Sequence, residues 1–173
     1  EAAAESIGAD PILARTGAYF HDIGKLKRPY FFTENQFTGD NPHLSLSPRM
    51  SKIIIAAHPK DGVEMAIKNK LPKILQDFML EHHGTTLVSY FYSQALSEEQ
   101  DDSPTSKEEF RYPGPKPQFK ESGIVMLADS VEAAVKSLEK PTPTKIENMI
   151  DRIFKDKIDD EQLDECPLSL KEI

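Results

Sequence analysis

The sequence predicts an all-α protein that folds as a single domain. Helix-start signals recur along the chain, because a capping residue precedes a proline at Asp10-Pro11 and again at Ser47-Pro48. Side chains also follow helical spacing at i, i+3, i+4 and i+7, as in Leu75, Phe78, Met79 and His82. A chain of 173 residues is long enough to bury one substantial core.

The N-terminal part is expected to hold three short helices. The first begins at Asp10-Pro11, and Gly24 can close it, since glycine is common just past a helix end. The second begins at Ser47-Pro48 and is limited by Pro59. Residues 60–70 form the third.

Prolines and glycines divide the middle of the chain in the same way. Pro72 opens a further helix that Gly84 interrupts or ends, and residues 85–96 continue as another helix or as its extension. Residues 97–109 (SEEQDDSPTSKEE) are acidic with almost nothing to bury, which predicts a mobile loop.

Two longer helices are expected in the C-terminal part. The segment FRYPGPKP at 110–117 imposes an extended, non-helical path. Residues 118–139 then form a long helix, and residues 145–158 form an amphipathic one for which Thr144 is a possible N-cap. The last residues predict a short helix and the start of another.

Composition and charge exclude several classes of protein. The formal net charge of −8 argues against binding to a nucleic-acid polymer, which requires a basic face. The single cysteine, Cys166, cannot form an internal disulfide. No apolar run approaches the ~20 residues that a membrane-spanning helix needs, so we expect no membrane contact by this segment itself.

Histidines and aspartates provide the strongest functional signal. His21 precedes Asp22, and His82-His83 is a doublet. Asp129 lies among small apolar residues, where a carboxylate needs a partner. Singly, each has an ordinary explanation: His58 can cap a helix end, one His of the doublet can be partly buried, and Asp129 can bond to the backbone. Together they predict a metal centre, since imidazoles and carboxylates bind Fe, Mn and Zn.

This ordered set resembles the HD-domain metal-dependent phosphohydrolase superfamily, and HDIGK at 21–25 is a variant of its central motif. The stretches ARTGAYFHDIGKLKRPYFFTENQ, NPH, AAHPKDGVEMA, EHHGTTLVSYFY, FRYPGPKPQ and MLADSVEAAVKSL further resemble the cytoplasmic HD domain of PgpH-type proteins, over residues 1–140. Those are bacterial receptors with seven membrane spans. The resemblance implies an HD-domain helical bundle, with one HD (HDIG) phosphohydrolase domain at residues 1–173.

The resemblance also implies an activity and its cofactors. The activity is hydrolysis of cyclic di-AMP to 5′-pApA, by attack of a metal-bridging hydroxide on the phosphodiester. The cofactors are two divalent transition metals, with Fe or Mn favoured, although ligand type alone does not separate them from Zn. Asp22 bridges the two metals. The other ligands are His21 and Asp129 for one metal, and His58, His82 and His83 for the second.

Two departures from the family pattern carry expectations of their own. The pattern begins with a histidine before HDIGK, and none precedes His21. Because EAAAES resembles the second half of a helix, we expect an N-terminally truncated fragment of a larger protein, with that ligand upstream of Glu1. The larger protein would be a bacterial cell-membrane protein with this domain in the cytoplasm. The cyclic-di-GMP branch carries GYP after the histidine doublet, and HHGTT stands here instead, which argues against cyclic di-GMP.

Five residues are candidates for contact with the substrate, and Lys25 is also a candidate catalytic residue beside Asp22. Lys25 is expected to contact a phosphate oxygen as a point charge, or else to be a solvated surface lysine. Arg111, with Tyr112 in the same loop, contacts substrate or acts as a buttress. Tyr30 heads an aromatic run that can stack on adenine or belong to the core. His43 approaches the substrate or packs under its loop.

Two other functions are also compatible with the sequence. One is a different HD phosphohydrolase that acts on cyclic di-GMP, mononucleotides or guanosine tetraphosphate. The other is a non-catalytic module that binds a nucleotide and reports it to a partner. The presence of all six of these histidines and aspartates argues against the module, because nucleotide binding alone needs no bridging carboxylate.

Overall fold

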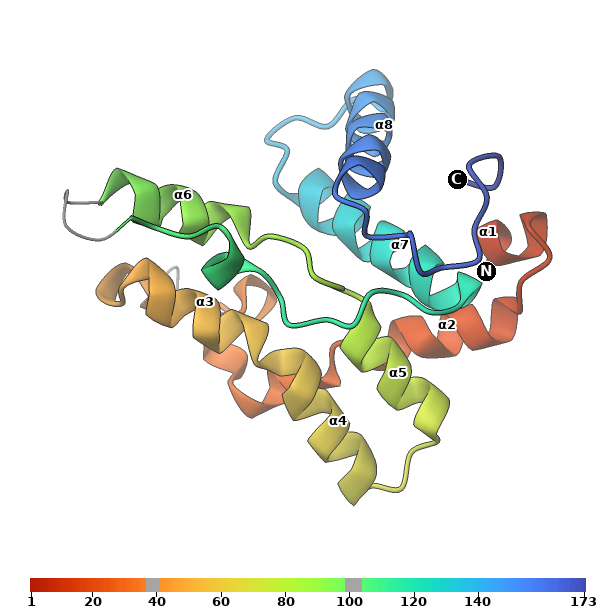
Figure 1. The fold of residues 1–173 in the computed structure, drawn as a ribbon, viewed down its shortest axis with the longest axis horizontal. Helices are drawn as coiled ribbons and strands as arrows, with labels where there is room; N and C mark the ends of the chain where they lie inside the picture. Colours follow the sequence, from red (N-terminus) through yellow and green to blue (C-terminus); the bar gives the residue numbers. More distant parts are fainter. Residues whose placement is uncertain (37–40, 99–103) are drawn as a thin grey trace.

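The computed structural model describes residues 1–36, 41–98 and 104–173, and these contain helices and no strand, as predicted (Figure 1). The α-helices are α1 (Ala2–Ser6), α2 (Pro11–Phe20), α3 (Pro48–Ala56), α4 (His58–Lys68), α5 (Lys73–Glu81), α6 (Ser89–Ser97), α7 (Lys120–Lys136) and α8 (Pro143–Asp159). The 3-10 helices are η1 (Ile23–Lys27), η2 (Pro29–Phe31), η3 (Thr33–Asn35), η4 (Pro42–Ser45) and η5 (Glu108–Phe110). None of the helices described is both long and apolar enough to cross a bilayer.

Helix α2 begins at the predicted residue but ends earlier than expected. The Asp10 carboxylate accepts hydrogen bonds from the backbone N–H groups of Ile12 and Leu13 at 2.9 and 3.0 Å, which is the N-cap arrangement. The helix stops at Phe20, so the prediction that Gly24 closes it was wrong. Gly24 lies inside η1 and packs against α4, where a Cβ would lie 1.9 Å from the carbonyl oxygen of His58.

We expect Asp10→Ala to lower the free energy of unfolding by about 1 kcal/mol, because two N-terminal N–H groups of α2 lose their acceptor. Urea denaturation followed by circular dichroism measures the change. Asp151→Ala, at an exposed position of α8, is the matched control and should leave the midpoint unchanged. Equal midpoints for Asp10→Ala and the wild type would contradict the capping assignment.

Prolines set the starts of several helices. Helix α3 begins after Ser47, whose side chain accepts from Met50 N, as predicted. Pro59 does not merely limit α3, because it occupies the first turn of α4. Helix α4 therefore covers most of the predicted 60–70 helix, and α5 begins directly after Pro72, as predicted.

The helix expected at 85–96 starts only at Ser89, because the preceding residues pair with the extended segment after η5. Tyr112 N donates to Thr86 O, and Val88 N donates to Phe110 O, both at 2.9 Å. Leu87 and Arg111 form the isolated antiparallel bridge between these segments. The two segments run side by side in Figure 1.

The segment at 97–109 is described only in part. Helix α6 runs to Ser97 and η5 begins at Glu108, whereas residues 99–103 lie outside the described residues, so the prediction of a mobile loop stays untested there. The extended path predicted around 110–117 is confirmed from Arg111 onward.

Two C-terminal predictions need correction. Thr142, and not Thr144, caps α8, and its side chain accepts from Lys145 N. The reason is that Pro143 takes the first helical position, which suits a residue without an N–H. Residues 160–173 form turns, so the short helix predicted there is absent.

The main core lies where α2, α4, α5 and α7 meet. Phe78 and Met79 of α5 are completely buried, and Ala66, Leu75 and Val125 pack with them. Helices α3 and α6 pack together at one end of the molecule, and α8 packs on α7 (Figure 1). The ends of α2 and α5 and the start of α4 are thereby brought to one place.

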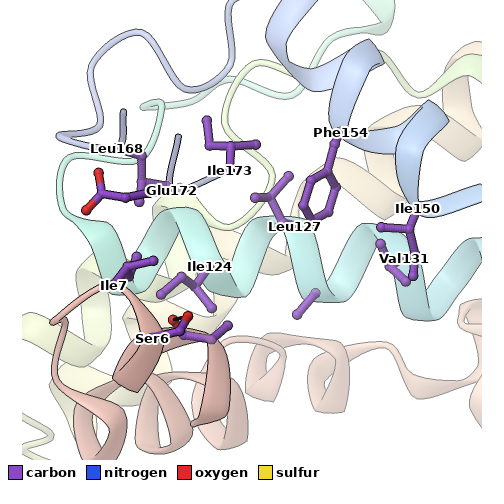
Figure 2. Close-up of a pocket in the computed structure, with 12 residues that line it drawn as sticks. Ser6, Ile7, Ile124, Leu127, Val131, Ile150, Phe154, Leu168, Glu172 and Ile173 are labelled. Carbon is purple, nitrogen blue, oxygen red and sulfur yellow. Dashed lines mark hydrogen bonds between the residues drawn. The ribbon is translucent and has the colours of Figure 1, made fainter. Parts of the chain in front are cut away.

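The apolar stripe of α7 faces a groove of about 260 Å³ (Figure 2). Ile124, Leu127 and Val131 line its floor, with Phe154 of α8 and Ile173 near the C-terminus on another side. None of its lining residues is among the predicted metal ligands.

Candidate metal centre

Six predicted ligands come together from four helix regions. His21 and Asp22 follow the last turn of α2, and His58 opens α4. His82 and His83 follow α5, and Asp129 lies in the middle of α7. The ends of α2 and α5, the start of α4 and the middle of α7 meet because the main core packs these four helices against one another.

The ligand atoms form two groups that share Asp22. One atom from each of Asp22, His58, His82 and His83 lies within 4.8 Å of the others, and the same holds for His21, Asp22 and Asp129. Asp22 Oδ1 lies 3.2 Å from His58 Nε2 and 3.5 Å from His82 Nε2. Asp22 Oδ2 lies 3.2 Å from His21 Nε2. One carboxylate therefore presents a different oxygen to each group, which is the arrangement of a bridging ligand.

Backbone carbonyls fix the orientation of three of the imidazole rings. The Nδ1 atoms of His21 and His58 lie 2.7 Å from Ala18 O and Ile55 O, and His82 Nδ1 lies 2.9 Å from Met79 O. A carbonyl oxygen only accepts, so each Nδ1 carries the proton and donates it. The Nε2 atom of each ring then faces the centre, which is how metal-ligating histidines are held.

Several atoms in the centre lack the partners that their burial requires. His58 Nε2 and His82 Nε2 are 3.0 Å apart, and with both Nδ1 atoms protonated two lone pairs face each other. His21 Nε2 and Asp22 Oδ1 are buried without a hydrogen-bond partner. Cations would satisfy these atoms together, so the residues present fit divalent metals. Imidazoles with carboxylates suit Fe, Mn and Zn.

The electrostatics of the centre also favour cation binding. Burial works against ionisation of Asp22, but His21, His58 and His82 outweigh it and hold its pKa below the usual range. Burial disfavours charge on His21 as well, yet Asp129 and Asp22 raise the pKa of that ring to about 10, so without a metal a proton occupies the Nε2 position that a metal ion would take. Burial lowers the pKa of both His82 and His83, which keeps them in the neutral form that binds metals.

Lys25 lies beside the shared carboxylate. Its Nζ is 2.6 Å from Asp22 Oδ2 and 2.9 Å from Glu34 Oε1, and it lies 5.4 Å from the ring centroid of Phe32. Lys25 therefore lies next to Asp22, and its contact with a substrate stays a prediction. Its pairing with Glu34 was not predicted. Nothing in the local sequence indicates that Glu34 pairs with Lys25, because that pairing depends on the tertiary fold.

The aromatic run after HDIGK divides between the core and the surface. Phe32 is buried, with its ring edge-on to His58 at a centroid distance of 5.6 Å. Tyr30 is 50% exposed and contacts only the ring of Phe31 among the described aromatic rings. Phe32 therefore belongs to the core. Tyr30 is exposed enough to contact a ligand.

The loop after η5 supplies Tyr112 and Arg111 in different roles. The Tyr112 ring stacks on His83 with a centroid distance of 4.2 Å and an interplanar angle of 25°. The Arg111 guanidinium donates to both carboxylate oxygens of Asp160, at 2.7 and 3.0 Å, and to Thr85 O at 2.7 Å. These contacts favour the buttress alternative for Arg111.

His43 packs under its own loop. Its Nε2 donates to Phe31 O at 3.0 Å, and its ring lies 5.5 and 5.0 Å from the ring centroids of Phe31 and Phe91. These contacts favour the packing alternative over an approach to substrate.

Known proteins resemble this chain over its whole length. A family model described as "HD domain" matches residues 1–134. The chain is 53% identical over 173 residues to cyclic-di-AMP phosphodiesterase PgpH of Bacillus subtilis, and 48% identical over 174 residues to the protein of that name from Listeria monocytogenes. All of this chain is covered in both cases, but only 24% of each relative, so the chain spans about a quarter of their length.

A solved structure is also similar to this chain. It is the HD domain of L. monocytogenes phosphodiesterase PgpH in complex with cyclic di-AMP, with a TM-score of 0.94 and 47% sequence identity. The alignment covers 99% of this chain and 78% of that one. The fold and the arrangement of its helices are therefore those of a characterised domain.

Proposed function

The chain belongs to the HD domain family, and from this premise we propose that it is a metal-dependent phosphodiesterase that hydrolyses cyclic di-AMP to 5′-pApA. The observation that carries the proposal is the sharing of Asp22, whose two oxygens face two separate ligand groups. The choice of substrate is supported by relatives named cyclic-di-AMP phosphodiesterase and by the similar solved domain in complex with cyclic di-AMP.

We propose Fe or Mn as the metals. Such ions, when bound, polarise the phosphodiester and lower the pKa of water enough to supply a nucleophile near neutral pH. Asp22 belongs to both sites. The remaining ligands divide into His21 and Asp129 for one ion, and His58, His82 and His83 for the other.

The chain's own residues orient the substrate and exclude water. The ammonium of Lys25, beside Asp22, offers a point charge to a phosphate oxygen placed over the centre. Glu34 holds that ammonium from its other side. Tyr112 covers one face of His83, which keeps solvent from that ligand.

We expect Lys25→Met to lower kcat/KM for cyclic di-AMP by about 100-fold, which is the size of effect seen when a donor to a developing charge is removed. Bound metal should not change, because the side chain is not a ligand. Lys60→Met, at an exposed position of α4, is the control and should keep full activity. Steady-state kinetics with metal analysis of each protein measures both quantities. Unchanged kcat/KM in Lys25→Met would contradict a contact between this lysine and the substrate.

Chromatography of the reaction products tests the proposed function against its alternatives. Full-length protein and this chain, each loaded with Mn²⁺, are incubated separately with cyclic di-AMP, cyclic di-GMP and nucleoside triphosphates. The proposal predicts 5′-pApA from cyclic di-AMP as the dominant product. Faster turnover of another nucleotide would assign a different phosphohydrolase, and tight binding of cyclic di-AMP without turnover would assign a binding module.

We also propose that the domain is the cytoplasmic part of a larger bacterial membrane protein. The support is the length of the relatives, which extend well beyond the region shared with this chain. Fractionation of cells that express the full-length protein, followed by protease treatment of intact spheroplasts, tests this. The domain should sediment with membranes and stay protected from protease.

A further inference from the structure

Thr86 connects two parts of the metal centre through its main chain. Its N–H donates to His83 O at 3.0 Å, and its carbonyl accepts from Tyr112 N at 2.9 Å. Tyr112 in turn stacks on the His83 ring. The position of Thr86 therefore sets both a metal ligand and the aromatic ring that covers it.

The Thr86 side chain is held by a buried lysine. Lys157, in the last turns of α8, is 7% exposed, and its Nζ donates to Thr86 Oγ1 at 2.7 Å. No carboxylate among the described residues forms an ion pair with it, although lysines are rarely so buried without one. Burial lowers the pKa of Lys157 to about 8, against the attraction of Asp129 and Asp160. A charged ammonium group at this position is therefore unfavourable, because it is buried without an ion pair among the described residues.

Neighbouring residues at the end of α8 hold the adjacent residue of the same loop. Gln162 Oε1 accepts from Thr85 N at 2.8 Å, and Gln162 Nε2 donates to Thr85 Oγ1 at 2.9 Å. Asp160 binds the Arg111 guanidinium, which also donates to Thr85 O. Lys157, Asp160 and Gln162, which make these contacts at the end of α8 and just after it, lie beyond residues 1–134, the part that the family model matches.

We propose that Lys157 is a positioning residue for the metal centre, which holds His83 and Tyr112 in place through Thr86. The inference rests on the proposed metal centre and adds to it a residue outside the ligand set. Loss of the contact should loosen His83 as a ligand, since removal of an outer partner of a metal ligand costs about 10- to 100-fold in metal affinity.

A double-mutant cycle on the full-length protein tests this inference. Lys157→Met removes the donor, Thr86→Val removes the acceptor with little change in shape, and the double variant removes both. Titration with Mn²⁺, followed by electron paramagnetic resonance of the free ion, gives the dissociation constant of each site. We expect each single variant to weaken one ion by about tenfold, and the double variant to be no weaker. Lys155→Met, at an exposed position on the same helix, should match the wild type.

Three results would overturn the inference. Wild-type Mn²⁺ affinity in Thr86→Val combined with weak affinity in Lys157→Met would mean that the lysine charge acts directly. Wild-type affinity in both, with only a lower melting temperature, would mean a structural role alone. Wild-type protein that binds no Mn²⁺ would contradict the metal centre itself. If Lys157→Met does not fold, Thr86→Val decides alone, because unchanged affinity in that variant excludes positioning through Thr86.

Discussion

Asp22→Ala is expected to abolish binding of both metal ions and to lower turnover of cyclic di-AMP by at least about 1,000-fold. Asp22 contacts the histidines of both ligand groups through different oxygens, so its loss opens both sites at once. A bound metal contributes several kcal/mol of transition-state stabilisation, and each ~1.4 kcal/mol corresponds to a tenfold rate. Metal analysis and single-turnover kinetics on the same preparation measure the two effects.

Asp129→Ala is the comparison variant, in which we expect the loss of one metal ion instead of two. Asp129 belongs only to the group with His21, at 3.6 Å from His21 Nε2. Its loss should therefore remove one ion and leave the group of His58, His82 and His83 loaded. Wild-type turnover by Asp22→Ala protein without metal would contradict the mechanism, and loss of both ions from Asp129→Ala would contradict the division into two groups.

Gly24→Ala is expected to lower the free energy of unfolding by about 3 kcal/mol, at the upper end of the range for overpacked sites. A Cβ at this position would lie 1.9 Å from His58 O and 2.5 Å from Gly62 N, and both are backbone atoms that side-chain rotation cannot move aside. Because His58 opens α4 as a ligand, Mn²⁺ binding should weaken in the same variant. Chemical denaturation and metal titration measure the two losses.

Gly62→Ala is the matched control, because Gly62 faces Gly24 across the same contact. Its Cβ would lie 3.4 Å from Gly24 N and 3.4 Å from Met79 Sδ, which is ordinary contact. Inside α4 the alanine also gains up to about 1 kcal/mol of helix propensity. We expect stability equal to or slightly above the wild type. Equal losses in the two variants would mean that the close approach of η1 and α4 is not what requires Gly24.

The clustering of the six candidate ligands could be predicted from sequence because their signals are local and ordered. His21-Asp22 and His82-His83 are adjacent pairs near predicted helix ends, and Asp129 stands out as a carboxylate among apolar residues. In a helical bundle, residues near helix ends and on the apolar face of another helix can lie close together in space. The structure groups these residues as the resemblance implied, with Asp22 common to both groups.

The residues that the sequence did not reveal are those whose role depends on tertiary pairing. Glu34 and Lys157 are ordinary charged residues in a chain with 29% charged residues, and no motif indicates that Glu34 pairs with Lys25 or that Lys157 is buried. Only the fold places Glu34 beside Lys25 and buries Lys157 against Thr86.

Errors in helix boundaries have a similar origin. A glycine after a helical stretch indicates a helix end, but Gly24 is instead required by the close approach of α4. The helix expected from residue 85 is delayed because Thr86 and Val88 form backbone hydrogen bonds to the segment after η5. Both helix boundaries depend on contacts with residues far along the chain. Local sequence propensity does not predict such contacts.

The most direct test of the account is anomalous diffraction from crystals of the full-length protein, or of this domain within it, grown with Mn²⁺. We expect two anomalous peaks, one on either side of the Asp22 carboxylate. The first should lie among His58, His82 and His83, and the second beside His21 and Asp129. A single peak, or two peaks of which only one contacts Asp22, would contradict the shared two-metal centre.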